Sequence, residues 1–144
     1  MDLFVNRFHT LLLALVFSVN AHGLTDEHIG EISATELVSN YKKFAKHLND
    51  KSYSEGQLSA ISSIKDPILI KVFFGTWCHD SQREVPRLVN LLTKANNPNI
   101  KVWLYALDLD KQDPKGLAKQ NNILYTPTMI FEKQGKEVHR SIER

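Results

Sequence analysis

The sequence predicts an α/β domain with a central mixed sheet of about four strands flanked by helices. A continuous apolar run, residues 68–74, leads into a segment with apolar residues at helical spacing, and a second apolar run follows at residues 100–107. This strand, helix, strand order implies two parallel strands joined by a right-handed crossover. A third apolar segment, residues 123–131, and a turn at Gln134-Gly135 then predict a hairpin that completes the sheet.

The first 21 residues have the pattern of a secretory signal peptide. Arg7 precedes a short apolar run, residues 11–17, and small residues allow cleavage after Ala21. An uncleaved anchor is the alternative, but the run is too short to span a bilayer. We therefore expect an exported, periplasmic protein that keeps no membrane span after the signal is cleaved.

Length and composition limit the classes of protein to which the chain can belong. The chain has 144 residues, 42% of them hydrophobic, which is enough for one domain with a proper core. Its net charge of +2 is dispersed, and no basic block favours binding to nucleic acid or to an anionic membrane surface. Cys78 is the single cysteine, so the chain cannot close a disulfide within itself, although disulfides form readily outside the cytoplasm.

Residues 22–65 are predicted to form an N-terminal helical extension. Its first part, residues 22–32, has no clear period and is expected to be a loose lead. A helix is expected over residues 33–49, because it starts with the spacing of a capping box and continues with apolar residues on one face. A shorter helix begins near Ser54 and ends before Pro67, since the residue ahead of a proline disfavours helical geometry.

The main domain is predicted over residues 66–144. A helix follows Cys78 up to about Ala95, and Pro86 inside it should bend its axis. A short helix is expected at residues 114–121. The strand over residues 123–131 is begun by a proline, and residues 136–142 form the last strand of the hairpin.

Cys78 lies where the first apolar strand runs into the helix. Backbone N–H groups without helical partners and the positive end of the helix dipole both favour a thiolate at this position. A lone cysteine in the middle of a strand or helix more often behaves as a small inert hydrophobe. The position of Cys78 therefore favours a reactive thiol over a structural one.

The residues around Cys78 resemble the active site of thioredoxins. Trp77-Cys78-His79-Asp80-Ser81 resembles their W-C-x-x-C turn, with Ser81 in place of the second cysteine, and Pro86 lies where those proteins kink their active-site helix. Tyr125-Thr126-Pro127-Thr128 is similar to their loop before a cis-proline, which faces the active cysteine. The resemblance covers about residues 66–142. It implies a thioredoxin-like domain of the exported bacterial kind with a Cys-x-x-Ser motif.

Several positions depart from the thioredoxin pattern. Val72 stands where the family usually has a buried acid, and Ala106 replaces a lysine; both of these groups assist proton transfer in dithiol reduction. The C-terminal helix of the family is expected to be missing, because Arg144 follows closely on the last predicted strand. Either the helix over residues 33–49 covers the sheet face that the terminal helix normally covers, or the domain is incomplete.

We expect Cys78 to act as the nucleophile that attacks a disulfide sulfur and forms a mixed disulfide. Ser81 can donate a hydrogen bond to the thiolate, but it cannot resolve the mixed disulfide. Release must come from a second thiol on the substrate, which gives isomerisation, or from a small external thiol, which gives deglutathionylation. The expected partners are therefore protein or low-molecular-weight thiols and disulfides.

The neighbouring residues are expected to tune the site and bind substrate. A protonated His79 would favour the thiolate, whereas Asp80 opposes it and Arg83, three residues further on, can partly neutralise Asp80. Trp77 packs beside the turn and presents an apolar surface to a partner. The resemblance implies that Thr126 and Pro127 bind substrate: a cis Pro127 would leave the backbone of Thr126 free to pair with an extended substrate segment.

Other functions stay open at this point. Adjacent Cys78, His79 and Asp80 rarely converge on one ion, so we expect no metal, and exchange chemistry needs no cofactor. Peroxide reduction through a sulfenic acid at Cys78 is one alternative. A binding or chaperone module without redox turnover is another, and enzymatic activity and oligomeric state are not fixed by the sequence.

Overall fold

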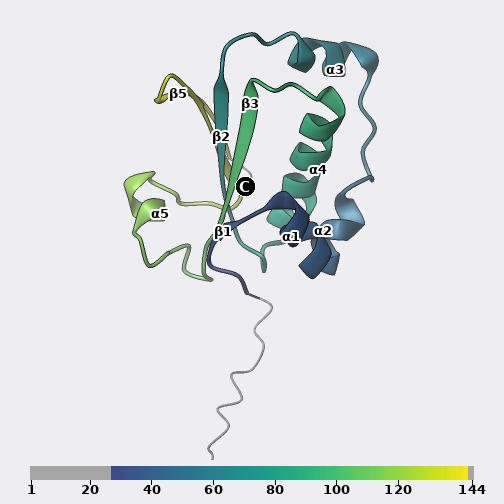
Figure 1. The fold of residues 1–144 in the computed structure, drawn as a ribbon. Coiled ribbons are helices and arrows are strands. Elements are labelled where there is room, and N and C mark those ends of the chain that lie inside the picture. The colour runs from purple at the N-terminus through teal and green to yellow at the C-terminus, as the bar shows by residue number, and fades with distance from the viewer. Residues whose placement is uncertain (1–26, 143–144) are drawn as a thin grey trace, which may run out of the picture.

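The computed structural model describes residues 27–142, so the predicted signal peptide at residues 1–21 lies outside the described residues. Five strands form one sheet with helices against it (Figure 1). The elements, in chain order, are β1 (Gly30–Ile32), α1 (Ala34–Asn40), α2 (Lys42–His47), α3 (Glu55–Ser62), β2 (Ile68–Phe74), α4 (His79–Ala95), β3 (Ile100–Ala106), α5 (Leu117–Gln120), β4 (Thr128–Lys133) and β5 (Lys136–Ile142).

The sheet is mixed and has the strand order β1-β3-β2-β4-β5. β2 pairs in parallel with β3 along its whole length, and β4 pairs antiparallel with β2 on the other side. The hairpin of β4 and β5 is present as predicted, with a bulge next to Phe131 and Glu132. The central strand pair therefore ends at the junction that carries Cys78.

β1 is a fifth strand that the sequence does not predict. Residues 22–32 were expected to be loose, but Gly30, Glu31 and Ile32 pair antiparallel with the last three residues of β3. A three-residue strand is too short to produce a visible alternation of apolar and polar side chains. β1 anchors the N-terminal segment to the end of the sheet near the Cys78 turn.

The prediction of one helix over residues 33–49 is wrong, because two helices occupy this segment. The predicted capping box at Ser33 and Glu36 starts α1, but the backbone at Tyr41 is extended, with φ −118° and ψ 94°. Asn40 precedes the break, and asparagine competes for backbone hydrogen bonds and weakens a helix. The break lets both Leu37 and Phe44 reach the core, where each is fully buried.

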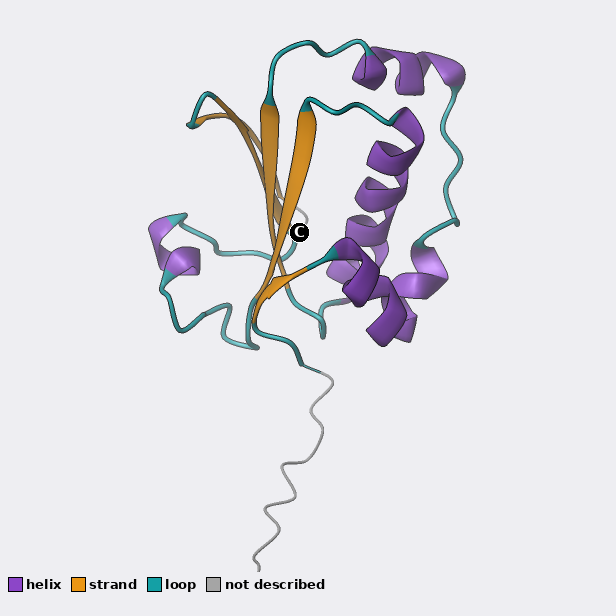
Figure 2. Ribbon diagram, in the orientation of Figure 1, coloured by secondary structure: helices purple, strands orange, loops and turns teal. Residues whose placement is uncertain are grey.

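Helices cover the two faces of the sheet unequally (Figure 2). α1, α2 and α4 lie on one face, where their apolar side chains form the larger core with β2 and β3. The core residues of this face include Leu37, Phe44, Val72, Phe74, Val85, Leu104 and Ala106. On the other face, α5 helps to enclose a smaller cluster around Phe73 and Tyr105. α1 and α2 therefore cover the same sheet face as α4.

The helix after the Cys78 turn matches its prediction. α4 contains Pro86 and ends at Asn96, which adopts a left-handed conformation. Val85 and Pro86 are buried against the sheet. This packing fixes the direction of α4 and the place of its first turn, where Cys78 is the N-cap residue.

Two predicted elements are shorter than expected. α5 begins only at Leu117, because the Asp113 carboxylate accepts hydrogen bonds from the backbone of Lys115, Leu117 and Ala118 and organises a turn before the helix. The third apolar run becomes a strand only from Thr128, and the residues ahead of it form a loop. This loop passes next to Cys78.

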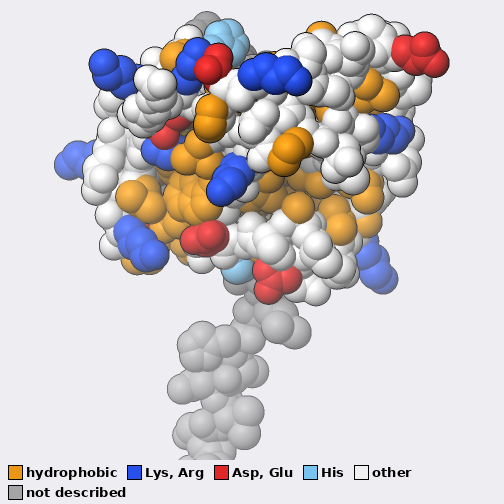
Figure 3. All heavy atoms as spheres, turned by 45° about the horizontal axis from the view of Figure 1, so that its top comes forward, with side chains coloured by type: hydrophobic (Ala, Val, Ile, Leu, Met, Phe, Trp, Pro, Cys, Tyr) orange, Lys and Arg blue, Asp and Glu red, His pale blue; other side chains and the backbone are white. Residues whose placement is uncertain are grey.

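The surface agrees with the dispersed charges of the sequence. On the face drawn in Figure 3, Lys and Arg side chains stand singly between apolar and uncharged groups and do not form a block. Within residues 27–142, no helix combines the length and apolar composition that crossing a membrane requires.

Candidate active site

Cys78 is the N-cap of α4 and its thiol is partly exposed. The backbone N–H of Cys78 donates to the carbonyl oxygen of Gly75 at 3.1 Å, which closes a tight turn after β2. The Sγ atom donates to the carbonyl oxygen of Thr126 at 3.1 Å. The thiol is thus held between the first turn of α4 and the loop that precedes β4.

Trp77 packs against the same turn. Its indole N–H donates to the carbonyl oxygen of Leu107 at 3.2 Å, which ties the turn to the end of β3. The ring lies so close to Gly75 that a Cβ atom there would come within 2.5 Å of it. The Nζ atom of Lys111 lies 5.8 Å from the centre of the indole ring, within cation–π range.

Two residues that the sequence did not single out hold the turn in place. Gln82 is buried, and its side-chain amide donates to the carbonyl oxygen of Thr76 at 2.7 Å. The hydroxyl of Thr76 accepts from the backbone N–H of His28 at 3.2 Å. Neither residue type carries a sequence signal for this role, since both contacts depend on how the chain folds back on itself.

Ser81 is fully buried one turn after Cys78. Its hydroxyl oxygen accepts a hydrogen bond from the backbone N–H of Gly75 at 3.2 Å. Among the hydrogen bonds of the described residues, none joins Ser81 to Cys78. Ser81 therefore links the backbone just after β2 to the first turn of α4 through this hydrogen bond.

Asp80 pairs with Arg83, as the sequence predicted. The two side chains are 2.9 Å apart, and Arg83 also contacts Glu84 at 2.6 Å. Hydrogen bonds to Glu84 and the charges of Glu84 and Asp80 raise the pKa of Arg83 above its usual value. Arg83 therefore keeps its positive charge next to Asp80, while His79 is exposed.

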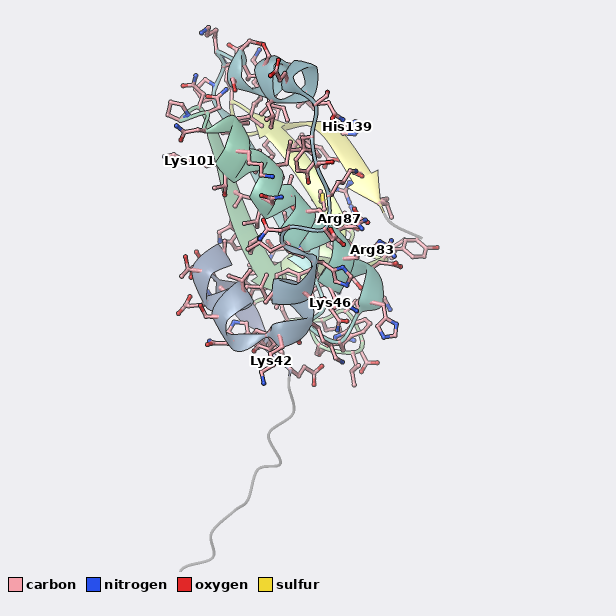
Figure 4. All side chains as sticks on the ribbon, turned by 90° about the vertical axis from the view of Figure 1, so that its right-hand side faces the viewer. Lys42, Lys46, Arg83, Arg87, Lys101 and His139 are labelled. Carbon is pink, nitrogen blue, oxygen red and sulfur yellow. The ribbon has the colours of Figure 1, made fainter. Side chains whose placement is uncertain are left out.

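The ion pairs continue along α4 away from the site. Figure 4 shows Arg83 and Arg87 on the same side of the helix. Arg87 contacts Glu84 at 2.9 Å and Asp50 at 3.0 Å, and Asp50 in turn contacts His47 at 2.7 Å. Hydrogen bonds from Arg87 and His47 lower the pKa of Asp50 to about 2.

The loop before β4 faces Cys78. The Thr126-Pro127 peptide bond is cis, and both residues are buried. Leu124 and Tyr125 just before them are exposed, as is Leu109 in the loop after β3. The two positions that depart from the thioredoxin pattern, Val72 and Ala106, lie fully buried in the core.

The family model described as Thioredoxin matches residues 43–144, a range that includes Cys78 and the loop before β4. The chain belongs to the thioredoxin family. Thioredoxin-fold structures are similar to the chain, and the family supports a thiol–disulfide redox function in general terms. The fold predicted from the sequence is confirmed.

Three solved structures illustrate the likeness. A protein of unknown function from Pseudomonas aeruginosa is 17% identical with a TM-score of 0.55, over 78% of this chain and 66% of that one. The chain thus spans slightly less than two thirds of that protein. A protein named Trxlp from Edwardsiella tarda is 21% identical with a TM-score of 0.46, over 62% and 82% of the two chains. A thioredoxin from Fasciola hepatica is 25% identical with a TM-score of 0.43, over 58% and 75%.

The structure brings most of the predicted site residues together. Cys78 contacts the carbonyl oxygen of Thr126, which precedes the cis Pro127. Trp77 is held in the same turn by its hydrogen bond to Leu107. Ser81 lies behind the turn, in contact with Gly75. The arrangement can present a thiol at a helix N-terminus, and the sequence contains no second cysteine that could pair with it.

Proposed function

We propose that this member of the thioredoxin family is a monothiol exchange protein that acts on disulfides through Cys78. The observation that carries the proposal is the position of Cys78: a partly exposed N-cap thiol against the carbonyl oxygen of Thr126, with serine at the place of a second cysteine. Unpaired N–H groups and the dipole of α4 favour a thiolate there.

The exchange step needs no cofactor, because one disulfide bond forms as another breaks. The Cys78 thiolate attacks one sulfur of a disulfide, a bond forms between the two sulfurs, and the other sulfur leaves as a thiolate that takes a proton from solvent. Ser81 has no sulfur with which to attack the mixed disulfide. A thiol on the substrate then gives isomerisation, and a small external thiol gives release of the substrate.

The side chains near the thiol have distinct parts in this step. Arg83 offsets the charge of Asp80, which would otherwise oppose a thiolate close by. Trp77 and the exposed Leu109, Leu124 and Tyr125 offer apolar surface to a partner chain.

The proposed location follows from the N-terminal sequence. A signal peptide over residues 1–21 would export the chain to the periplasm, where proteins contain disulfides. The substrate proposed for Cys78 would therefore be present in that compartment.

A second candidate is a binding module that holds extended chains without redox turnover. The exposed Leu109, Leu124 and Tyr125 beside the Thr126 loop favour it, because exposed apolar groups often mark a binding surface. In this alternative Cys78 would take no part in capture.

Cys78→Ala separates the two functions. Reduced wild type and variant are incubated with a protein that contains scrambled disulfides, and captured chains are compared with and without a reducing agent. Exchange predicts reductant-sensitive capture by the wild type and only weak, non-covalent binding by Cys78→Ala. Equal capture by both proteins would refute the exchange mechanism.

A further inference from the structure

We propose that the cavity beside the Cys78 turn binds a small thiol that carries carboxylates, held there as its mixed disulfide with Cys78. The proposal rests on the exchange function above and names its small-molecule substrate. It makes the protein selective for acidic low-molecular-weight disulfides over neutral or cationic ones.

The cavity lies between two segments that follow β3. It has a volume of about 520 Å³ and is lined by residues 110–113, the start of α5 and residues 122–124. This volume falls within the range of roughly 300–1,000 Å³ typical of small-molecule sites. Ile123 and Leu124 supply apolar surface, and Gln112 and Asn122 supply side-chain amides.

Cys78 does not line the cavity, but two of the lining residues lie close to the Cys78 turn. Leu124 lines it and is two residues from Thr126, whose carbonyl oxygen lies 3.1 Å from the Cys78 Sγ. Two residues of extended chain span at most about 7 Å. On the other side, Lys111 lines the cavity and its Nζ atom lies 5.8 Å from the Trp77 ring, directly before Cys78.

The charged groups of the cavity favour an anion. Lys111 and Lys119 both line it, and neither takes part in an ion pair among those of the described residues. Asp110 and Asp113 also line it. Asp110 and Lys119 are both exposed to solvent, where their opposite charges are screened, whereas Lys111 is only partly exposed and its charge is screened less.

The carboxylate of Asp113 already accepts hydrogen bonds from within the protein. It accepts from three backbone N–H groups and from the hydroxyl of Tyr105 at 3.2 Å. Partial burial acts to raise the pKa of Asp113, but these hydrogen bonds outweigh it and lower the pKa below its usual value. Lys111 is therefore the least screened charged group that the cavity leaves for a ligand.

The chemistry needs a small thiol at this position. In the first step the Cys78 thiolate attacks the sulfur of the small thiol in a disulfide with a substrate, and the substrate sulfur leaves as a thiolate and is protonated by solvent. In the second step another molecule of the small thiol attacks the same sulfur and releases Cys78. The substrate is reduced, and two small thiols are joined as their disulfide.

The test measures how fast Cys78 of the full chain forms a mixed disulfide, followed by intact mass. The probes are glutathione disulfide, which carries carboxylates, hydroxyethyl disulfide, which is neutral, and cystamine, which is cationic. A cysteine-containing peptide provides the intrinsic rates. We expect the wild-type rate with glutathione disulfide, relative to the neutral probe, to exceed the ratio for the peptide.

Lysine variants locate the effect. Lys111→Gln should lower the rate with glutathione disulfide about two- to fivefold, as expected for a partly exposed ion pair, and leave the neutral probe unchanged, whereas Lys119→Gln, at an exposed position, should lower it less. Lys94→Gln is the matched control, since the Nζ atom of Lys94 also lies over an aromatic ring, that of Tyr53, at 5.9 Å. Added salt should reduce the preference of the wild type without any substitution.

The outcomes separate this inference from the proposed function. If Cys78 forms mixed disulfides with all three probes in the ratio of the peptide, and the lysine variants and salt change nothing, the cavity has no such role although exchange stands. If Cys78 reacts with none of the probes, the exchange function itself fails. Loss of rate with all three probes in a lysine variant would also overturn the inference, because it would show a general effect on the thiol.

Discussion

The Sγ atom of Cys78 donates a hydrogen bond to the carbonyl oxygen of Thr126 at 3.1 Å, across 48 residues of sequence. This contact joins the N-terminus of α4 to the loop before β4 and fixes where the thiol points. A substrate segment that pairs with the backbone of Thr126 would lie directly beside the sulfur. Recognition and chemistry would therefore share one contact.

Arg83 should control the reactivity of Cys78 through Asp80. Arg83→Gln leaves the charge of Asp80 without its 2.9 Å partner, so alkylation of Cys78 by a neutral reagent should slow by roughly two- to fivefold. Asp80→Asn should speed it, and in that background Arg83→Gln should have little further effect. Arg87→Gln is the control one turn further along. Faster alkylation of the Arg83→Gln variant would contradict this account.

Ser81→Ala should lower stability. The substitution leaves the buried N–H of Gly75 without its acceptor, which should cost about 1–3 kcal/mol in the free energy of unfolding by urea. Ser63→Ala, which removes an exposed hydroxyl that donates to a carbonyl oxygen, should cost much less. An unchanged unfolding midpoint for Ser81→Ala would show that Gly75 does not depend on this hydroxyl.

Phe44→Ala should be strongly destabilising, because α2 belongs to the core of the domain. Phe44 is fully buried and packs edge-on against Phe74 of β2, with ring centres 5.7 Å apart. Loss of a buried aromatic side chain costs about 3–5 kcal/mol. Chemical denaturation measures this, and Val138→Ala at an exposed position is the control. A cost below about 1 kcal/mol would mean that α2 is not packed as described.

The Asp50 ion pairs should stabilise the fold in a pH-dependent way. Hydrogen bonds from Arg87 and His47 lower the pKa of Asp50 from 3.8 to about 2 in the folded state. A lowered folded-state pKa gives stability that is fully present above 3.8 and is lost as the pH falls toward about 2.

Asp50→Asn provides the measurement. The difference in unfolding free energy between wild type and variant should be full at about pH 5 and shrink steadily below the ordinary pKa of the carboxyl. This difference is measured by thermal or urea unfolding of both proteins at several pH values. A difference that grows on acidification would have the wrong sign for a paired carboxylate.

The elements with strong local signals could be predicted from the sequence. β2 is a continuous apolar run that begins after Pro67, and α4 has apolar residues at helical spacing and a left-handed Asn96 at its end. The signals of β1 and of the break at Tyr41 are not local. β1 exists because the end of β3 offers it a partner, and the break depends on how Leu37 and Phe44 pack.

In the candidate site, too, some residues could be identified from local sequence signals, whereas other features depend on contacts between distant segments. Cys78 and Trp77 could be identified from their place in the chain and the motif around them, and Thr126 and Pro127 from the family resemblance. The contacts of Gln82 with Thr76 and of Lys111 with Trp77 join different segments, and no residue pattern indicates them. The position of Ser81 behind the turn likewise depends on its contact with Gly75.

We propose that Cys78 starts an exchange which the chain cannot finish alone. Reduced full-length protein is mixed with an equimolar peptide whose single cysteine carries a thiopyridyl disulfide, so that the leaving group cannot attack back, and the mixture is followed by intact mass, with Ser81→Cys as the matched variant. We expect a one-to-one mixed disulfide at Cys78 that persists until a small thiol is added, whereas Ser81→Cys should release the peptide unaided. Two results would contradict this proposal. One is an adduct of the wild type that forms no faster than the adduct of a simple cysteine-containing peptide with the same disulfide, and the other is an adduct that resolves without added thiol.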